Sequence, residues 1–585
     1  MVKTRGMGAI LALLLAFPLG LSGLTINRLN GGANIIYIDF SIPGRVVPLE
    51  LVRSYNSITA LSEASGWSGA FGWGWTSPFE TTLTVTPERH VLLRDGGSGN
   101  SVVFKPEKED PRVRDEFFES VRVAHFERQR GKKLSPQELG GLKLPDKMVT
   151  RLKTEPAYRN EIAAKYALQV RIPMGEVLVS SEYGYQTIQF KDNQWVRDRD
   201  GVRQVFDSEG RLVRQIDRTG FQFLFKYSAQ NRSQIVEISD PERSMSYKFN
   251  WRQDRVVEVS DNRNLRARYT YDGAGNLSQV IDSNNQTFGY KYENRKFPHL
   301  LTKIEYPSEA LDTGAKIFRD VQYDDNGLVV RHREKDATEV SFTYGRSPSD
   351  AENNFWTKSV RKLADGSADE QYDEYFLKGK PDGTKYLYKQ ENRSKGVTTV
   401  TVFNPCCGKP LQLVRNGEVT NFKYFENGLL MERVGPKEDL KLEYDPRWKK
   451  VSRVSQNGLV SSYEYDVRGN LVRASNTRDE KVTLSYDRFG RILQMRDGTK
   501  RLIGFRYGQH GKPEMIEEKG VGKIKISYGA DGRIQGAETF AAGAKSRVPS
   551  DSRSQEVVRR VMKGFQQLLD IIRPAGISLT ANPAG

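Results

Sequence analysis

Apolar and polar positions in the C-terminal half of the chain follow one short pattern that returns at a nearly constant interval. The pattern begins with an aromatic residue, often followed by Asp, and continues with two variable residues, Gly, one further residue, and Leu or Ile. Residues 465–471 read YDVRGNL and residues 486–492 read YDRFGRI. The aromatic positions recur about every 21 residues, at Phe403, Tyr424, Tyr444, Tyr465, Tyr486, Tyr507 and Tyr528. This regular spacing indicates an internal repeat.

The first half of the chain repeats less regularly. Its aromatic positions recur about every 21 or 22 residues, at Phe206, Tyr227, Phe249, Tyr271 and Tyr292. Tyr323 follows after an insertion, and Tyr344 occupies the next aromatic position at the usual interval. Between about 345 and 402 the pattern is blurred, with Tyr386 and Tyr388 as the candidates for its aromatic position.

One repeat unit predicts one β-hairpin. Asp and Gly after the aromatic favour a turn in which Gly adopts a positive φ without steric cost. Leu471–Ala474 then predicts a strand, Asn476–Glu480 a polar turn, and Val482–Tyr486 a return strand of alternating pattern. Because a lone hairpin is unstable in water, the units must stack into a shared sheet. We therefore predict an all-β fold of hairpin repeats over residues 169–540, in which the repeat Asp forms turns and is not a catalytic acid.

Residues 107–168 interrupt this β-pattern with helical signals. Phe117, Phe118, Val121 and Ala124 recur at helical spacing, Ser135–Glu138 forms a capping box with Pro at the first helical position, and 155–168 predicts another helix. The segment predicts a helical insertion. Two interpretations stay open, a small subdomain packed on the sheet and a docking surface for a partner or cargo.

The tail, residues 541–585, contains a second helical signal. Ser552–Gln555 is a capping box, and Pro574 and Gly576 end the pattern. The apolar stripe consists of Val557, Val558, Val561, Met562, Phe565, Leu568, Leu569 and Ile572. We predict an amphipathic helix over 554–572 that docks on the last repeats, near Tyr507 to Phe540, and caps the open end of the sheet. Binding to a partner protein or to a membrane surface are the alternatives.

The N-terminus is typical of an export signal. Lys3 and Arg5 precede an apolar run from Ala9 to Phe17, and the small residues Ser22 and Gly23 follow. The run is too short to span a bilayer. We predict a signal peptide over 1–23 and an exported protein that is periplasmic, cell-surface or secreted; a buried N-terminal strand is the alternative.

Composition excludes several classes of protein. The 585 residues contain five histidines without metal-ligand spacing and two adjacent cysteines, Cys406 and Cys407, which occupy a repeat turn. A multi-site structural zinc protein and a disulfide-rich scaffold are therefore excluded, the histidine spacing disfavours a zinc hydrolase, and no catalytic, cofactor-binding or metal-binding residue is predicted. The net charge is +17, but basic and acidic residues alternate, which favours a mixed solvated surface over nucleic-acid binding.

The opening segment carries a family resemblance. Residues 39–45 (DFSIPGR), Pro48-Leu49, 53–57 (RSYNS) and 71–75 (FGWGW) resemble the start of rearrangement-hotspot (Rhs) shells, and the repeats resemble the tyrosine-aspartate (YD) repeat. The repeat also occurs in teneurins and in the B and C components of insecticidal toxin complexes. The resemblance assigns 24–106 to an N-terminal Rhs-type β-domain. It implies a hollow β-shell, which in that family usually encloses a toxic C-terminal polypeptide. Trp73 and Trp75 are expected to pack against backbone, with sugar stacking as the alternative.

The chain also departs from that family. The family's self-cleavage core contains paired Asp-Pro-x-Gly motifs, whereas Asp240-Pro241 and Asp445-Pro446 lack the glycine. No toxin domain is expected after Phe540, and no self-cleavage. We expect an exported, non-catalytic scaffold that acts as a containment or delivery shell, or part of one, for a separately encoded polypeptide or with a second shell protein. The alternative is a cell-surface adhesin that binds carbohydrate.

Overall fold

The computed structural model describes most of the chain from residue 24 onward. The described residues are 24–42, 49–61, 68–97, 99–180, 185–199, 201–217, 222–241, 245–262, 264–283, 285–307, 318–333, 338–363, 366–380, 385–405, 408–488, 490–499, 501–508, 513–528, 534–542, 560, 561, 563, 567, 568, 571 and 572. The predicted signal peptide, both cysteines and the predicted Ser552–Gln555 capping box lie outside them.

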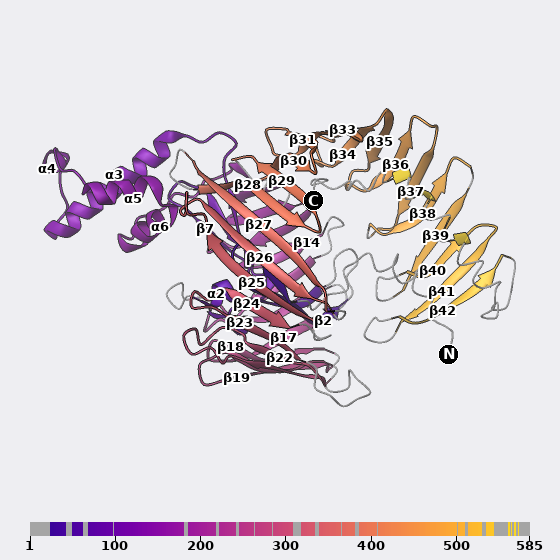
Figure 1. The fold of residues 1–585 in the computed structure, drawn as a ribbon, viewed down its shortest axis with the longest axis horizontal. Helices are drawn as coiled ribbons and strands as arrows, with labels where there is room; N and C mark the ends of the chain where they lie inside the picture. The colour runs from indigo at the N-terminus through magenta and orange to yellow at the C-terminus, as the bar shows by residue number, and fades with distance from the viewer. Residues whose placement is uncertain are drawn as a thin grey trace.

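One sheet of 33 strands dominates the structure, and each strand pairs antiparallel with its neighbour in sequence. The all-β prediction is confirmed. Figure 1 shows this sheet as an arch that runs from β14 and β17 over β25 to β29, across β30 to β35, and down to β42.

The first strands of this sheet are β10 (Val177–Ser180), β11 (Gln186–Lys191), β12 (Gln194–Arg199), β13 (Val202–Phe206), β14 (Leu212–Ile216), β15 (Gln222–Tyr227), β16 (Ile235–Asp240), β17 (Met245–Arg252), β18 (Arg255–Asp261), β19 (Arg266–Tyr271), β20 (Leu277–Ile281), β21 (Thr287–Lys291), β22 (Lys303–Glu305), β23 (Phe318–Tyr323), β24 (Val329–Arg333) and β25 (Glu339–Arg346). The remaining strands are β26 (Asn354–Lys362), β27 (Ala368–Gly379), β28 (Lys385–Ser394), β29 (Val397–Phe403), β30 (Pro410–Arg415), β31 (Glu418–Tyr424), β32 (Leu430–Gly435), β33 (Glu438–Tyr444), β34 (Val451–Gln456), β35 (Leu459–Tyr465), β36 (Leu471–Asn476), β37 (Lys481–Tyr486), β38 (Ile492–Asp497), β39 (Leu502–Tyr507), β40 (Pro513–Glu518), β41 (Gly522–Tyr528) and β42 (Ile534–Ala541).

Copies of the repeat within the described residues form the predicted hairpin turn. In the copy that starts at Tyr465, the Asp466 carboxylate accepts hydrogen bonds from the backbone N–H groups of Arg468 and Asn470 at 2.8 and 2.9 Å. Gly469 has φ 76°, the left-handed region that glycine adopts at little cost. The same pattern recurs around Asp272 and Asp324. The repeat Asp is therefore a turn-forming residue in these copies, as predicted.

The repeat tyrosines connect consecutive hairpins. Nine of the repeat hydroxyls each donate to a backbone carbonyl 14, 15 or 22 residues earlier, at 2.6–3.0 Å, and burial raises the pKa of Tyr424 to about 12. The nine pairs are Tyr227 to Leu212, Tyr271 to Val256, Tyr323 to Leu301, Tyr344 to Val329, Tyr424 to Pro410, Tyr444 to Leu430, Tyr465 to Val451, Tyr486 to Leu471, and Tyr507 to Ile492.

Basic residues that follow several turns reinforce this ladder. The Lys450 ammonium lies 5.7 Å from the centre of the Tyr465 ring and donates to the Gly469 carbonyl of the next turn at 2.8 Å. Arg211 and Arg491 lie over Tyr227 and Tyr507 at 5.2 and 4.5 Å. Part of the positive charge of the chain therefore acts inside the repeat as cation–π contacts.

Replacing one ladder tyrosine tests this linkage. We expect Tyr465→Phe to lower the free energy of unfolding by about 1 kcal/mol, because the Val451 carbonyl loses its hydroxyl donor. Tyr388→Phe is the control, because among the described contacts the Tyr388 hydroxyl makes no such backbone bond. Equal stability of the two variants in urea denaturation would argue against a stabilising ladder.

The blurred region of the sequence forms the longest strands of the large sheet. β26, β27 and β28 contain 9, 12 and 10 residues. Tyr388 packs edge-on against Phe376, with ring centres 6.2 Å apart, and is not followed by the Asp–Gly turn. The repeat signal is lost here because the strands continue past the point where other copies turn.

The N-terminal segment forms small sheets that pack on the large one. Strands β1 (Thr25–Asn27), β2 (Gly32–Ile42), β3 (Leu49–Asn56) and β6 (Trp75–Thr76) form one sheet, β4 (Ser68–Gly69) pairs with β5 (Gly72–Trp73), and β7 (Thr82–Val85), β8 (Val91–Arg94) and β9 (Ser101–Phe104) form a third. Helix α2 (Ser57–Ala60) and the short helix η1 (Pro78–Glu80) lie between strands. A single apolar cluster contains residues of this segment together with residues of β15 to β25.

The beginning of the large sheet is closed by this segment. Lys105, which follows β9, forms a bridge with Val179 in β10, and Thr82 in β7 forms a bridge with Arg211. The sheet of β7 to β9 therefore contacts β10 through Lys105 and the residue before β14 through Thr82, and so connects the two ends of the β10–β14 region. A separate apolar core fills the enclosed space and includes Phe104 and Trp195, which are fully or almost fully buried.

The helical insertion is a small subdomain with its own core. It comprises α3 (Pro111–Arg130), α4 (Pro136–Leu139), α5 (Asp146–Thr154) and α6 (Pro156–Lys165), and the Ser135–Glu138 capping box is present. Figure 1 shows these helices projecting away from the sheet. Buried Arg159 is ion-paired with Glu88 in the β7–β8 turn. The docking interpretation stays a prediction.

Candidate binding surface on the inner face of the sheet

One face of the large sheet, which we call the inner face, can be followed through its register, because residues paired across strands share a face. The pairs run Leu440–Arg433, Arg433–Phe422, Thr420–Leu413, Leu413–Thr401, Thr401–Gln390 and Gln390–Tyr375. At one end of this path Leu440 belongs to the core of the last repeats. At the other end Tyr375 and its neighbours face the N-terminal segment. The inner face therefore has two covered ends and a central stretch.

A buried ion pair forms the centre of the N-terminal segment. The Arg53 Nη2 atom lies 2.8 Å from an oxygen of Asp39, and the Arg53 Nε atom forms a second bond to the same carboxylate. Arg53 and Asp39 are 1% and 8% exposed. The Tyr269 hydroxyl, from β19, donates to Asp39 at 2.8 Å. Burial acts to lower the pKa of Arg53, but Asp39 and nearby tyrosines raise it well above its ordinary value.

The aromatic residues of the opening motif surround this pair and contact the sheet. Trp75 is fully buried, lies 5.0 Å from the Arg53 guanidinium, and donates its indole N–H to Tyr292 at 2.9 Å. Trp73 stacks on His299 with ring centres 4.4 Å apart. A Cβ on Gly72 would lie 2.9 Å from a backbone oxygen of Gly275. The structure thus supports packing, and not sugar stacking, for both tryptophans.

The start of the chain is also fixed to the middle of the sheet. Arg28, which follows β1, donates to buried Asp373 in β27 at 3.0 Å, and its carbonyl accepts from Thr357 at 2.7 Å. Asp373 also accepts hydrogen bonds from Gln390 and Asn392, at 3.2 and 2.8 Å. Strands β26 to β28 of the sheet and the N-terminal segment therefore share one polar cluster.

The opposite end of the inner face is covered by helical residues of the tail. The described residues Arg560, Val561, Lys563, Gln567, Leu568, Ile571 and Ile572 are helical. Val561, Leu568 and Ile572 are 0%, 0% and 6% exposed and belong to the apolar core of the last repeats. Gln567 accepts a hydrogen bond from Arg501 at 2.6 Å. The capping residues 552–555 predicted for this helix lie outside the described part of the chain.

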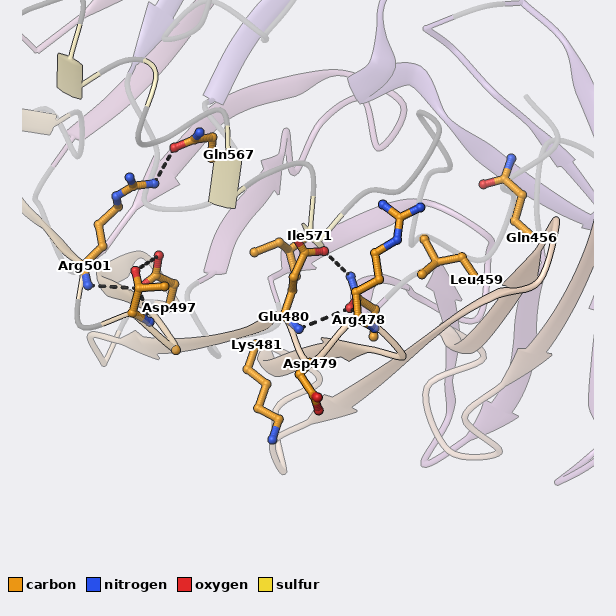
Figure 2. Close-up of a pocket in the computed structure, with 13 residues that line it drawn as sticks. Gln456, Leu459, Arg478, Asp479, Glu480, Lys481, Asp497, Arg501, Gln567 and Ile571 are labelled. Atoms are coloured by element: carbon orange, nitrogen blue, oxygen red, sulfur yellow. Dashed lines mark hydrogen bonds between the residues drawn. The ribbon is translucent and has the colours of Figure 1, made fainter.

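A cleft of about 820 Å³ separates the tail helix from the turns of the sheet. Figure 2 shows Gln567 and Ile571 above the turns that contain Arg478, Asp479 and Asp497. The lining contains both basic and acidic side chains, so its charge favours neither an anionic nor a cationic ligand. The described tail residues contact Arg501, just before β39, and share a core with residues from Leu430 to Ile526. Capping of the open edge stays a prediction.

The central stretch of the inner face differs from both ends. Between Tyr375 and Leu429 the structure shows no buried hydrophobic side chain among the residues it describes. The inner positions of β28 to β31 are mainly polar and at most half-buried; they include Gln390, Asn392, Thr399, Thr401, Leu413, Thr420 and Phe422. This stretch is the candidate binding surface, which the sequence alone did not single out.

Chemistry-bearing residues take structural positions. Asp445, from one of the two Asp-Pro pairs, accepts backbone bonds from Arg447 and Trp448 in a turn. Among the described residues no group of three or more His, Cys, Asp or Glu side chains is arranged to hold a metal ion. In the same part of the chain, none of the helices has both the length and the apolar character that a membrane span needs.

Family models match three parts of the chain. Residues 25–104 match a domain of unknown function (DUF6531), residues 251–287 the RHS repeat, and residues 367–519 the teneurin YD-shell. The repeat hairpins thus define a protein of the wound β-shell class. The chain thus contains a segment similar to the RHS repeat and a longer segment similar to the teneurin YD-shell.

Solved structures of toxin-complex proteins are similar to the chain. The crystal structure of TcdB2-TccC3-Cdc42 is 11% identical, with a TM-score of 0.36, and the match covers 88% of this chain and 31% of that chain. For TcdB2-TccC3-TEV the values are 11%, 0.36, 92% and 32%. For the Photorhabdus luminescens Tc holotoxin pore they are 12%, 0.36, 88% and 31%. The chain thus spans about a third of the length of these proteins. No curated protein matches it.

Proposed function

We propose that the chain is an exported, non-catalytic scaffold that forms a containment shell, or part of one, for a separately encoded polypeptide. The observation that carries the proposal is the central inner face, a polar surface between two ends that the chain covers with its own segments. A polar, half-buried lining allows a polypeptide to be held without the strong apolar adhesion that would prevent its release. The proposed segments are 1–23, 24–106, 107–168, 169–540 and 541–585, as inferred from the sequence.

A second shell protein is the other partner that we propose. The beginning of the large sheet is closed by β7 to β9, whereas β42 pairs only with β41 among the described strands. An unpaired edge presents backbone donors and acceptors to a further strand. Continuation of the sheet by a second chain fits this asymmetry.

The adhesin alternative gains no support from the repeat tyrosines. Nine of their hydroxyls donate to backbone carbonyls, and four of these nine rings lie beside a basic side chain. Sugar stacking needs a free ring face. The ladder therefore accounts for the tyrosines without a glycan.

Two neighbouring residues of β29 test the proposal. Thr401 lies on the inner face, and Val400 lies on the opposite face of the same strand. Each is replaced by Cys in a chain whose Cys406 and Cys407 are Ser, and the protein is co-expressed with the polypeptides encoded by its neighbouring genes. We expect a co-purifying polypeptide to slow maleimide labelling of Thr401→Cys at least about tenfold and to leave Val400→Cys unchanged.

The same preparation separates containment from surface binding. A contained polypeptide resists added protease until the shell is unfolded. If a neighbouring polypeptide binds but is digested freely, and both cysteines label at unchanged rates, the containment proposal is wrong. Specific binding on a glycan array, without any polypeptide partner, would favour the adhesin alternative.

A further inference from the structure

A histidine lies beneath the first strand of the chain. His332, on β24, is 6% exposed, and its ring stacks on Phe342 with centres 5.8 Å apart. A cavity of about 320 Å³ brings it together with Leu24, Ile26 and Arg28 of the β1 segment. The Val329 N–H of β24 donates to the carbonyl of Gly31, which lies between β1 and β2, at 3.0 Å. The imidazole is thus covered by the segment that begins the N-terminal domain.

Cations dominate the surroundings of this imidazole. Arg319 on β23 and Arg361 on β26 interact with it electrostatically and oppose a positive charge on the ring, whereas the smaller effect of Asp320 favours that charge. Arg28, directly after β1, lines the same cavity. The nearby acids are engaged with other cations: Asp320 with Arg333 at 2.6 Å, Asp369 with Lys395 at 3.2 Å, Glu370 with Lys358 at 2.9 Å, and Asp373 with Arg28 at 3.0 Å.

We propose that His332 is an acid-operated latch, whose protonation loosens the β1 segment from the inner face of the sheet. A new cation at this position meets Arg319 and Arg361, while the imidazole itself is 6% exposed and so has little access to water. Moving β1 away hydrates the imidazolium and relieves the repulsion. The inference concerns the chain itself and does not depend on the presence of a contained polypeptide.

The direction of the pH effect on opening follows from the pKa of His332 in the closed and open states. Burial, followed by Arg319 and Arg361, lowers the pKa of His332 from 6.5 to about 4 when β1 is in place. When β1 is displaced, the ring is hydrated and its pKa returns toward the ordinary value. The open state therefore binds more protons between pH 6.5 and 4, and acidification favours opening over that range. At pH 4.5 these two pKa values correspond to an opening constant about 75-fold larger than at pH 8.

Two other titratable side chains, Glu80 and His90, make the stability of other parts of the fold depend on pH. Burial raises the pKa of Glu80, the last residue of η1, to about 7, so protonation of Glu80 stabilises the folded state as the pH falls below 7. Burial lowers the pKa of His90, at the junction with the helical insertion. Global stability therefore sums opposing effects, and the latch must be measured at β1 itself.

Hydrogen exchange of the full-length chain provides that local measurement. Exchange of peptides covering residues 24–34, corrected for intrinsic rates, is compared at pH 8 and pH 4.5. We expect protection in the unmodified protein to fall about 75-fold. His332→Phe keeps an aromatic ring beside Phe342 without a titratable group and should abolish most of this loss, whereas His90→Phe, the matched control, should leave it unchanged.

A second variant covers the case in which His332→Phe does not fold. Arg361→Gln removes an exposed neighbouring cation and should reduce the loss of protection at pH 4.5 at least threefold. The latch is refuted if 24–34 stay protected at pH 4.5 in the unmodified protein. It is equally refuted if a folded His332→Phe protein, or Arg361→Gln, loses protection as the unmodified protein does, since protonation of carboxylates such as Asp373 would then explain the opening.

Discussion

Replacing Asp39 with Ala is expected to lower the free energy of unfolding by about 3–5 kcal/mol, because it leaves the Arg53 guanidinium buried without its carboxylate. Arg53 is 1% exposed and makes both of its charge-assisted bonds to Asp39. The Tyr269 hydroxyl loses its acceptor in the same variant. Since folded domains are typically stable by only about 5–15 kcal/mol, the N-terminal segment should detach from the sheet or fail to fold.

Two controls separate the ion pair from a general loss of charge. Glu464→Ala removes one partner of an exposed pair, Glu464–Arg473, and should change stability by less than about 1 kcal/mol. The double replacement Asp39→Leu with Arg53→Met removes both charges and should recover much of the loss. Urea denaturation followed by tryptophan fluorescence measures all three. An Asp39→Ala protein as stable as Glu464→Ala would show that the pair does not hold the segment.

The buried pair Asp39–Arg53 and the exposed pair Glu464–Arg473 show which contacts can be predicted from sequence and which cannot. Asp39 and Arg53 belong to motifs that the sequence connects to Rhs shells, but no pattern in the chain states that they pair. Their role arises from burial among Tyr37, Trp75 and Tyr269, and the last of these comes from a distant part of the sequence, in β19 of the large sheet. Local spacing carries no information about such contacts.

The repeats were predictable because their determinants are local. Turn formation by Asp466 and Gly469 involves residues within one copy, and strand alternation follows from the next few residues. The strands β36 (Leu471–Asn476) and β37 (Lys481–Tyr486) accordingly lie at or close to the expected positions. The cation over each of several tyrosines was missed, although a Lys or Arg directly after the turn glycine, as in Arg211 and Arg491, was a visible signal.

The candidate binding surface depends on long-range geometry. The register of the large sheet determines which face of β28 to β31 is the inner face. The exposure of that face depends on how far the N-terminal segment and the tail helix extend over it. Arg28 reaches Asp373 across 345 residues of sequence. The long strands β26 to β28, where the repeat pattern blurs, mark the transition between the two covered ends, and this blur was the one sequence signal of the surface.

Replacing Leu568 with Asp is expected to detach the tail helix from the last repeats. Leu568 is fully buried in the same core as Met495 and Ile503, which are also fully buried. Even a Leu-to-Ala change at such a site costs about 2–5 kcal/mol, and a buried carboxylate adds a desolvation penalty. Detachment exposes an apolar face, so the variant should bind several-fold more of a hydrophobic dye and aggregate at a lower temperature.

The exposed helical residue Lys563 provides the matched control. Lys563→Asp places the same carboxylate on the same helix, but on its solvent side, and should leave dye binding and aggregation close to those of the unmodified protein. Deleting 554–572 should reproduce the Leu568→Asp result, since both expose the core of the last repeats. If Leu568→Asp remains monomeric, equally stable and no better at binding dye, while losing a binding partner, the helix is a docking peptide and does not stabilise the sheet.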